Sequence, residues 1–196
     1  PLLKEVDFVV GNLEGPITEN ASVSIGSVIG SPENYRFTFA TSTAETLFRH
    51  NIKVVNIGNN HIGDFGLSGI ASTRAYLTGA GIGFFGGKVN NSTVYRLSQK
   101  GVNLSFVSYN QFGGEGVEVV AKTIEAEHSA GNKVIVYTHW GEEYVEATKH
   151  EKETAALFVK SGADIVIGSH PHIVQAFEKI QGVPVYYSLG NFIFDQ

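Results

Sequence analysis

The sequence contains no cysteine and no methionine, one tryptophan and five prolines among 196 residues. Without cysteine, disulfides, thiolate metal sites and cysteine nucleophiles are excluded, so a bound metal must be held by His, Asn, Asp or Glu. Because the chain opens at Pro1 and has no Met, we expect it to be a fragment, a processed product or an incompletely recorded chain.

Basic charge and long apolar runs are also scarce. Fourteen Lys and Arg against nineteen Asp and Glu give a formal net charge of −5. This balance provides no basic surface for a phosphate backbone, so we expect no nucleic-acid partner. No apolar run approaches the ~18 residues that cross a bilayer, and no charged-then-apolar leader precedes the first predicted strand. We therefore expect any leader or anchor to lie outside this chain.

The length and the apolar content of 42% favour one folded domain spanning residues 1–196. Short β-branched runs alternate with longer helical patterns, which is typical of an α/β fold with a parallel or mixed sheet. The predicted strands are 6–10, 52–57, 94–97, 102–109, 133–138, 164–167, 173–180 and 183–189. The predicted helices are 43–50, 67–77, 117–130 and 150–161.

The connections between these elements carry their own signals. Gly79 and Gly81 are expected to end the second helix. The strands 94–97 and 102–109 are expected to form an antiparallel hairpin, and the glycines of 83–87 and 113–116 to form turns. The Gly/Ser/Asn-rich stretch from Thr18 to Asn34 is the best candidate for a mobile surface loop.

Five apolar runs each end in a cluster of small and polar residues, at 11–14, 58–61, 139–143, 168–172 and 190–191. Ligands of α/β proteins bind beyond the carboxyl ends of strands, so we expect all five clusters to converge on one rim. The clusters deliver Asn, Glu and His, an oxygen and imidazole set that suits Mn, Fe, Zn or Mg rather than soft metals.

The seven histidines fall into two groups. Three lie in predicted helices, where a solvated or capping side chain is expected: His50, His128 and His150. Four directly follow predicted strands: His61, His139, His170 and His172. One post-strand histidine is more often structural than a ligand, but four of them beside Asn60 and Glu14 favour a metal site. The His170-Pro171-His172 pair carries most weight, because imidazoles two residues apart across a rigid proline can each face a different ion.

Other polar and aromatic residues near these clusters have two readings. Asp64 either orients the imidazole of His61 or serves as a turn residue before Gly66. Trp140 and Tyr144 either form the floor of a substrate pocket or only pack against other side chains, and packing is favoured for the tryptophan.

The remaining residues of this kind are also open. Glu142 and Glu143 are ligands, general bases or solvated charges at the rim, and the rim is favoured for Glu142. Ser188 and Asn191 either hold the last strand in place or bind substrate. No G-x-S-x-G or G-x-x-x-x-G-K-[ST] motif is present, which argues against a serine hydrolase and a nucleotide-binding loop.

The ordered motifs resemble a known family over nearly the whole chain. They are Gly11-Asn12-Leu13-Glu14, Asn59-Asn60-His61 with Asp64 and Gly66, His139-Trp140-Gly141 with Glu143-Tyr144, Gly162-Ala163-Asp164 through Gly168-Ser169-His170-Pro171-His172, and Tyr187-Ser188-Leu189-Gly190-Asn191-Phe192. This series resembles the bacterial capsule-synthesis (poly-γ-glutamate biosynthesis) family of the calcineurin-like metallophosphoesterase superfamily.

The resemblance implies a four-layer α/β/β/α sandwich with a two-metal centre at the strand ends. By analogy, Glu14, or in its place Asn12, would bridge the ions. Asn60, His139 and His170 would complete one site, and His172 would serve the other. His61 would be the catalytic imidazole, with Asp64 behind it. Two such ions activate a bridging water and stabilise an in-line transition state. Substrate contacts are expected at Trp140, Glu143 and Asn191.

The family pattern also begins with a strand ending in Gly-Asp, whose carboxylate is a metal ligand. Only ten residues precede Gly11 here, so we expect this first strand and its Asp to be absent from the chain. The site served by His172 would then be incomplete and the sheet would lose a central strand, leaving unpaired backbone edges. We expect the native product to extend further at its N-terminus.

Three functions compete at this point. The first is a metal-dependent hydrolase acting on a phosphoester, or on an amide or peptide-like bond, of an anionic cell-surface polymer. The second is a non-catalytic polymer-binding or assembly component of a capsule synthesis and export complex with membrane subunits. In the third, the post-strand histidines simply pack and hydrogen-bond, although burying four imidazoles needs a partner for each ring nitrogen. The resemblance implies an extracytoplasmic, membrane-anchored or cell-surface location.

Overall fold

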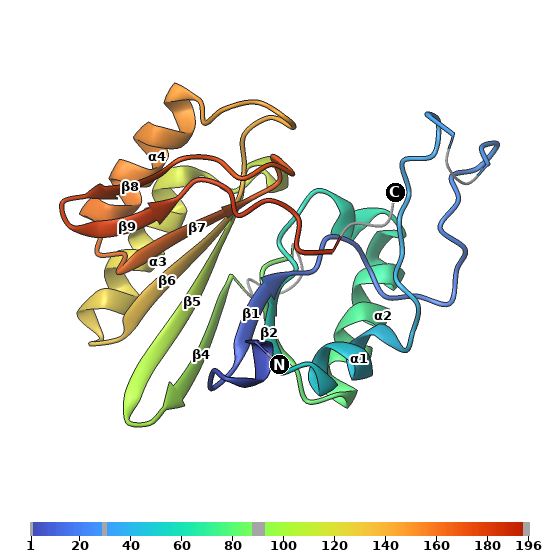
Figure 1. The fold of residues 1–196 in the computed structure, drawn as a ribbon, viewed down its shortest axis with the longest axis horizontal. Helices are drawn as coiled ribbons and strands as arrows, with labels where there is room; N and C mark the ends of the chain where they lie inside the picture. Colours follow the sequence, from blue (N-terminus) through green and yellow to red (C-terminus); the bar gives the residue numbers. More distant parts are fainter. Residues whose placement is uncertain (1, 29–30, 88–92, 194–196) are drawn as a thin grey trace. The chain divides into compact units, whose positions relative to one another are not determined.

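The computed structural model of the chain divides into two compact units, residues 1–87 and residues 88–195. The structure describes residues 2–28, 31–87 and 93–193. Each unit contains one β-sheet with helices packed against it (Figure 1). Parallel and mixed sheets flanked by helices confirm the predicted α/β class. The assignment of residues 1–196 to a single domain stays a prediction.

The first unit has a three-stranded parallel sheet in the order β1-β2-β3. Its strands are β1 (Val9–Asn12), β2 (Ile52–Asn56) and β3 (Gly83–Phe85). Its helices are α1 (Thr43–Arg49) and α2 (Gly66–Gly79), with short 3-10 turns η1 (Leu2–Lys4) and η2 (His61–Gly63). Val54 and Val55 of the central strand β2 are only 1% and 2% exposed, because a helix and the neighbouring strands surround this strand.

The second unit has a six-stranded mixed sheet in the order β4-β5-β6-β7-β9-β8. Its strands are β4 (Val94–Gln99), β5 (Val102–Asn110), β6 (Lys133–His139), β7 (Ile165–Ser169), β8 (Phe177–Ile180) and β9 (Val183–Tyr186). The strands β5, β6, β7 and β9 run parallel, and the hairpins β4–β5 and β8–β9 supply the antiparallel edges. The helices are α3 (Val117–Ser129) and α4 (Lys149–Lys160), with the 3-10 turn η3 (Gln111–Gly113).

The core of the second unit lies between its sheet and its helices. Its most buried apolar side chains come from the parallel strands and from both helices: Val107, Ile124, Val134, Val136, Phe158, Val166 and Val185. The helix α4 begins with a capping box, in which Thr148 and Glu151 each bond the other's backbone N–H. This core fixes the carboxyl ends of β6, β7 and β9, where three of the polar clusters begin.

Several predicted boundaries need correction. The first strand is Val9–Asn12 rather than 6–10, because Gly11 and Asn12 pair with β2 while Val6 is 53% exposed. Residues 83–85 form β3, paired with β2, where turns were predicted. The helix α2 includes Gly79 and ends before Gly81.

The last two strands are also shorter than predicted. The first begins at Phe177 rather than at residue 173, and the second ends at Tyr186 rather than at residue 189. An isolated bridge between Val174 and Leu189 replaces the longer pairing.

The segment from Thr18 to Asn34 is a loop, as expected, within the part that the structure describes; residues 29–30 lie outside it. In the described residues β1 is an edge strand of its sheet. A further strand upstream with a metal-binding Asp stays a prediction. Among the described helices, none combines the length and the apolar character that a membrane span requires.

Candidate functional site

The polar clusters lie at the carboxyl ends of parallel strands, as expected, but on two sheets rather than one. In the first unit Asn12 pairs with Asn56, so the clusters after β1 and β2 share a rim. In the second unit His139 pairs with Ser169, so the clusters after β6 and β7 share a rim, which the segment after β9 joins. The chain builds a separate sheet from each half, and the convergence of all five clusters on one rim stays a prediction.

In the first unit, hydrogen bonds link Asn59 to Asn12 and Asn12 to Glu14. Asn12 Nδ2 donates to Glu14 Oε2 over 3.0 Å. Asn59, which is 2% exposed, donates from Nδ2 to Asn12 Oδ1 over 3.3 Å and to Leu13 O over 2.8 Å. Both polar atoms of the Asn12 side chain are thus engaged, and its amide holds the carboxylate of Glu14 in place.

His61 and Asp64 are joined by a hydrogen bond. His61 Nδ1 lies 3.0 Å from Asp64 Oδ2, one turn later in the chain. A carboxylate oxygen only accepts, so Nδ1 carries the proton and Nε2 is the other titrating atom of the ring. Asp64 also ends η2, so both readings of this residue hold. Asn60 is exposed at the start of η2.

His139 ends β6 and is fully buried. Its Nδ1 lies 3.1 Å from Ser169 Oγ, and that hydroxyl donates to Thr138 O over 2.8 Å. Because the hydroxyl has only one proton, it must accept from His139, so Nδ1 is protonated and Nε2 carries the lone pair of the neutral ring. Such an anchored imidazole is typical of histidines that ligate metals.

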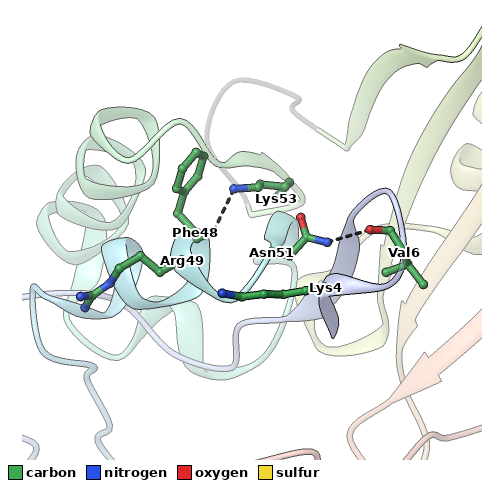
Figure 2. A pocket seen from close by; sticks show the side chains of 6 residues that line it. All are labelled: Lys4, Val6, Phe48, Arg49, Asn51 and Lys53. Carbon is green, nitrogen blue, oxygen red and sulfur yellow. Dashed lines mark hydrogen bonds between the residues drawn. The ribbon is translucent and has the colours of Figure 1, made fainter. Parts of the chain in front are cut away.

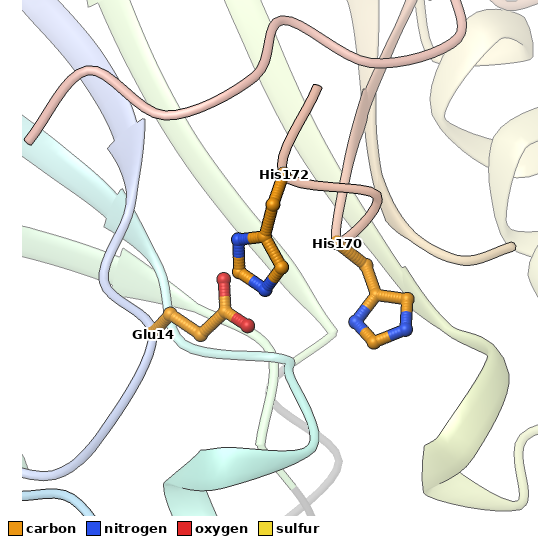
Figure 3. Close-up of side chains that lie close together, drawn as sticks. All are labelled: Glu14, His170 and His172. Carbon is orange, nitrogen blue, oxygen red and sulfur yellow. The ribbon is translucent and has the colours of Figure 1, made fainter. Parts of the chain in front are cut away.

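His170 and His172 lie on the loop after β7. Figure 3 draws these two imidazoles and, from the segment after β1, the carboxylate of Glu14. The backbone is left-handed at both histidines, with φ of 99° and 60°. Non-glycine residues in this region store about 1–3 kcal/mol each, and such strain clusters at functional sites. His172 Nδ1 lies 2.9 Å from Asn191 Oδ1, which makes Nε2 its lone-pair atom.

The rings of the three strand-end histidines of the second unit lie close together. The His139 and His170 centroids are 4.9 Å apart, and those of His170 and His172 are 6.0 Å apart. Two aromatic residues flank them: the Phe112 ring is 4.5 Å from His170, and the Tyr144 ring is 5.9 Å from His172. Both are partly exposed, at 44% and 60%.

Sequence reasoning missed Phe112, and no local pattern identifies it. It lies in η3, directly after β5, and the preceding Asn110 side chain fixes that turn by accepting from Phe112 N. The sequence analysis gave Ser169 no role of its own, and the register of β6 with β7 brings it to His139. It named Asn191 as a residue that holds the last strand or binds substrate, but did not predict its contact with His172.

Trp140 packs, as favoured. It is 1% exposed, its Nε1 donates to Tyr187 O over 2.9 Å, and the two rings stack at 6.0 Å. Gly168 is required beside this pair, because a Cβ there would lie 1.8 Å from Tyr187 O. Ser188 is buried and accepts from Gly190 N, which stabilises the turn after β9.

The other candidates remain at the surface. Glu142 and Glu143 are exposed, in agreement with the rim position favoured for Glu142. Substrate contacts by Trp140, Glu143 and Asn191 stay predictions. The three histidines expected to be solvated are all exposed: His50, His128 and His150.

A basic pocket of about 250 Å³ lies elsewhere in the first unit (Figure 2). It is lined by Lys4, Val6, Phe48, Arg49, Asn51 and Lys53, at the amino end of β2. Its cations are placed by a helix end: α1 finishes at Arg49, and Lys53 Nζ donates to Phe48 O over 2.9 Å. Cations complement the partial negative charge of a helix C-terminus, so this pocket is explained without a ligand.

The donors near the strand ends suit a metal of the oxygen and nitrogen class. Glu14, His170 and His172 each offer one ligand atom, a carboxylate oxygen or an imidazole nitrogen. Neutral imidazoles anchored through Nδ1, together with a carboxylate, are the ligands that Mn, Fe and Zn accept.

Known proteins similar to this chain point to one family. The chain is 28% identical to the "Capsule biosynthesis protein CapA" of Bacillus anthracis, and the match covers 100% of this chain and 52% of that protein. It is 26% identical to the "PGA biosynthesis protein CapA" of Bacillus subtilis, over 100% of this chain and 55% of that protein. The chain therefore spans about half the length of these curated relatives.

Solved structures agree on the fold. A hypothetical protein from Thermus thermophilus matches with a TM-score of 0.61 and 16% identity, over 96% of this chain and 67% of that chain. A candidate 5′-nucleotidase from Staphylococcus aureus matches with a TM-score of 0.58 and 15% identity, over 76% of this chain and 34% of that chain. These likenesses concern the fold alone, and they agree with the predicted metallophosphoesterase-like sandwich.

The family model described as "Bacterial capsule synthesis protein PGA_cap" matches residues 1–196. It covers both units, including every motif on which the resemblance rested. The chain belongs to the bacterial capsule synthesis protein family PGA_cap.

Proposed function

We propose that the chain forms the metal-dependent, phosphoesterase-like hydrolase part of a capsule or poly-γ-glutamate synthesis protein. One observation carries the proposal: three strand-end histidines have Nδ1 occupied by an anchoring acceptor. The pairs are His61–Asp64, His139–Ser169 and His172–Asn191. Histidines that only pack have no need for a shared orientation, whereas ligating and proton-transferring imidazoles do.

The proposed ligands come from both units. Glu14, held by Asn12, would bind the metal with Asn60 from the first unit, and His139, His170 and His172 would do so from the second. We propose that these donors serve a centre for one or two divalent ions, Mn, Fe, Zn or Mg. Such ions would lower the pKa of a bound water and stabilise charge on a phosphoryl group.

His61 is the proposed general acid. Its Nδ1–H is engaged by Asp64, so a proton on Nε2 is the one that can be transferred. When water attacks the phosphorus atom, the ester P–O bond breaks and the leaving oxygen takes this proton. The carboxylate of Asp64 holds the ring in position and stabilises the imidazolium before transfer.

The names of the relatives support the setting of this reaction. Those proteins are named for capsule and PGA biosynthesis, so we propose an anionic cell-surface polymer or a phosphoester intermediate as substrate. The same names support a role at the cell envelope. We also propose that the protein is anchored outside the cytoplasmic membrane, that it contacts membrane subunits of a synthesis complex and that it has no nucleic-acid partner.

Metal content and activity test this function. Elemental analysis of the 196-residue chain, beside a version extended at its N-terminus, should find a first-row divalent metal. Hydrolysis of phenyl phosphate, whose leaving oxygen depends on a proton, should fall at least about tenfold in His170→Ala and in His61→Ala, because one loses a ligand and the other the acid. The matched control is His150→Ala, since that side chain is exposed on α4. The proposal would be wrong if the extended protein contained no metal, or if both site variants kept wild-type activity.

A second function has its own observation. The relatives are named for synthesis and not for hydrolysis, so the rim could bind polymer without cleaving it within an assembly complex. Binding of purified poly-γ-glutamate by a hydrolytically inactive chain, weakened by His170→Ala, would favour this alternative.

A further inference from the structure

We infer that Phe37 is a positioning residue for His61, acting through its backbone N–H on Asp64 and through its ring on the imidazole. The inference rests on the proposed role of His61 as the general acid. It uses contacts within the first unit alone, and it assigns a task to residues 34–38, of which the sequence analysis assigned only Asn34, as the last residue of the predicted loop.

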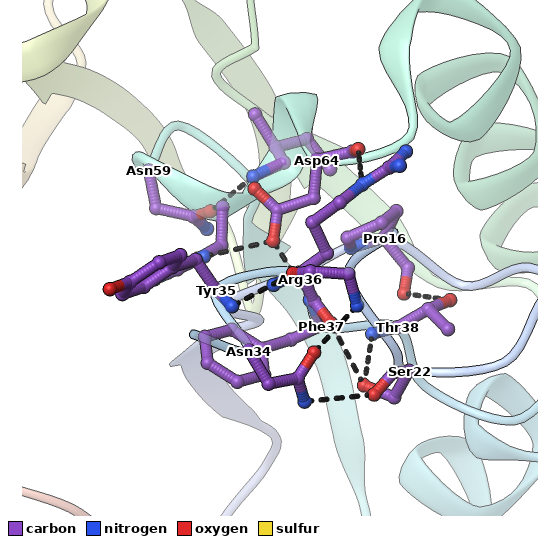
Figure 4. Close-up of polar contacts among 12 residues, drawn as sticks. Pro16, Ser22, Asn34, Tyr35, Arg36, Phe37, Thr38, Asn59 and Asp64 are labelled. Carbon is purple, nitrogen blue, oxygen red and sulfur yellow. Dashed lines mark hydrogen bonds and ion pairs between the residues drawn. The ribbon is translucent and has the colours of Figure 1, made fainter. Parts of the chain in front are cut away.

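The first step concerns the carboxylate of Asp64. Its Oδ2 accepts from Phe37 N over 2.9 Å and also faces His61 Nδ1 at 3.0 Å. Figure 4 shows Asp64 beside the segment that contains Phe37. The oxygen that accepts from this backbone is also the one that faces the imidazole. Two donors on one carboxylate oxygen fix its direction. The orientation of His61 thus depends on where Phe37 N lies.

The second step concerns the other end of Asp64. Arg36 Nε donates to Asp64 O over 2.8 Å, and its guanidinium lies 4.5 Å from the centre of the Phe65 ring. Adjacent residues of one segment therefore hold both the main chain and the side chain of Asp64. A residue that served only as a turn would need neither contact.

The third step is a direct contact between rings. The Phe37 and His61 centroids are 4.7 Å apart with an interplanar angle of 64°, an edge-to-face arrangement. Edge-to-face pairs are directional and add about 0.5–1.5 kcal/mol beyond burial. The Asp64 contact holds the imidazole at Nδ1, and the Phe37 ring restricts the rotation that this contact still allows.

The segment is itself held rigidly by side chains across the loop. Asn34 Oδ1 accepts from Ser24 N over 2.7 Å, and Asn34 Nδ2 donates to Ser22 O over 3.0 Å. Ser24 Oγ accepts from Tyr35 N, and Ser22 Oγ accepts from Thr38 N over 3.1 Å. Small polar side chains thus replace a β-ladder here, which keeps Phe37 in register with Asp64 without a strand.

Two substitutions separate positioning from packing. Phe37→Leu keeps the backbone N–H and most of the volume but removes the aromatic ring, whereas Phe37→Tyr keeps the ring. We expect Phe37→Leu to lower kcat for phenyl phosphate about tenfold with KM nearly unchanged, the lower end of the range for partners behind a site residue. Phe37→Tyr should restore most of the activity. Tyr35→Leu, a change of an exposed ring in the same segment, should leave kcat unchanged.

A spectroscopic readout decides the inference without activity. Nuclear Overhauser contacts between Phe37 and His61 ring protons are expected in the wild type, and long-range ¹H–¹⁵N spectra should show the Nδ1-protonated tautomer of His61. Phe37→Leu should shift the His61 ring signals, and Tyr35→Leu should not. Absent wild-type contacts, unshifted signals, or equal losses of kcat in Phe37→Leu and Tyr35→Leu would overturn the inference. A chain without hydrolase activity but with these spectra would refute the proposed function and leave the positioning of His61 intact.

Discussion

At the scale of single residues, one hydrogen bond decides which nitrogen three of the four strand-end histidines present. The Ser169 hydroxyl is committed to Thr138 O, so it can only accept from His139 Nδ1. If the serine hydroxyl were absent, the buried imidazole would lose the acceptor that selects its tautomer. The side chain of Ser169 therefore acts on the proposed metal site without touching the metal.

Ser169→Ala should weaken divalent metal binding by about 10- to 100-fold, the range measured when partners behind metal ligands are removed. A competition titration against a chelating fluorescent dye measures this affinity. Ser161→Ala is the matched control, because Ser161 is buried at the end of α4 in the same unit. Wild-type affinity in Ser169→Ala would remove His139 from the ligand set.

The sequence predicts the residues of this site better than it predicts their partners. His139 and His170 were identified because they directly follow apolar runs predicted to be strands, and a short stretch of sequence is enough to show this feature. Ser169 reaches His139 through the pairing of β6 with β7, and Phe37 reaches Asp64 from 27 positions upstream. Neither pairing is encoded in local periodicity, so these two hydrogen-bond partners came only from the structure, whereas Asp64, three residues after His61, was visible in the sequence.

At the scale of elements, prediction succeeded where a strand or helix carries a complete pattern. The hairpin of β4 and β5 has apolar residues interleaved with polar ones on both sides of a Lys-Gly turn, and both strands lie where expected. The strand β3 failed because it has three residues, two of them aromatic, followed by glycines. Its parallel pairing with β2 defines it, and only the folded sheet supplies that partner.

A buried carboxylate ties three elements of the second unit together. Glu127 of α3 is 5% exposed and accepts from Arg96 of β4 over 2.7 Å, from Ser105 of β5 over 2.8 Å and from Asn132 over 3.0 Å. The hydrogen bond from Arg96, opposed in part by burial, holds the pKa of Glu127 below its usual value. The edge hairpin is thereby fixed to the helix.

This network makes stability depend on pH. Because the folded-state pKa of Glu127 is lowered, its contribution is complete above the unfolded value near 4.5 and is lost as the pH falls through the folded value. Glu127→Gln should lower the free energy of unfolding by about 1.5–3 kcal/mol at pH 7. Urea titrations between pH 3 and 7 should find this difference shrinking below about pH 4.5.

The control for Glu127 is an exposed ion pair. Glu153→Gln breaks the Lys149–Glu153 contact on α4, whose side chains are 88% and 64% exposed. Its effect should stay within about 0.5 kcal/mol at every pH. Equal effects of the two substitutions, or a Glu127→Gln difference that does not change with pH, would contradict the role given to the network.

At the scale of the whole molecule, the proposed donors are divided between the two units. Glu14 and Asn60 follow strands of the first sheet, and His139, His170 and His172 follow strands of the second. Each unit has its own sheet and helices, so neither needs the other's strands to complete a ladder. A shared metal centre would couple their stabilities, since a ligand that binds only the folded, joined form stabilises it by mass action.

Metal should therefore raise the midpoint of thermal unfolding only when both halves supply their donors. At about 100 times its dissociation constant, Mn²⁺ or Zn²⁺ adds about 2.7 kcal/mol to the wild type. Glu14→Gln in the first unit and His172→Ala in the second should each abolish most of this shift, measured by scanning fluorimetry with and without chelator. The exposed residues Glu19 and His150 supply the controls, as Glu19→Gln and His150→Ala. If the second-unit variant alone lost the shift, the metal would belong to that unit's histidines, and the carboxylate of Glu14 would leave the proposed centre.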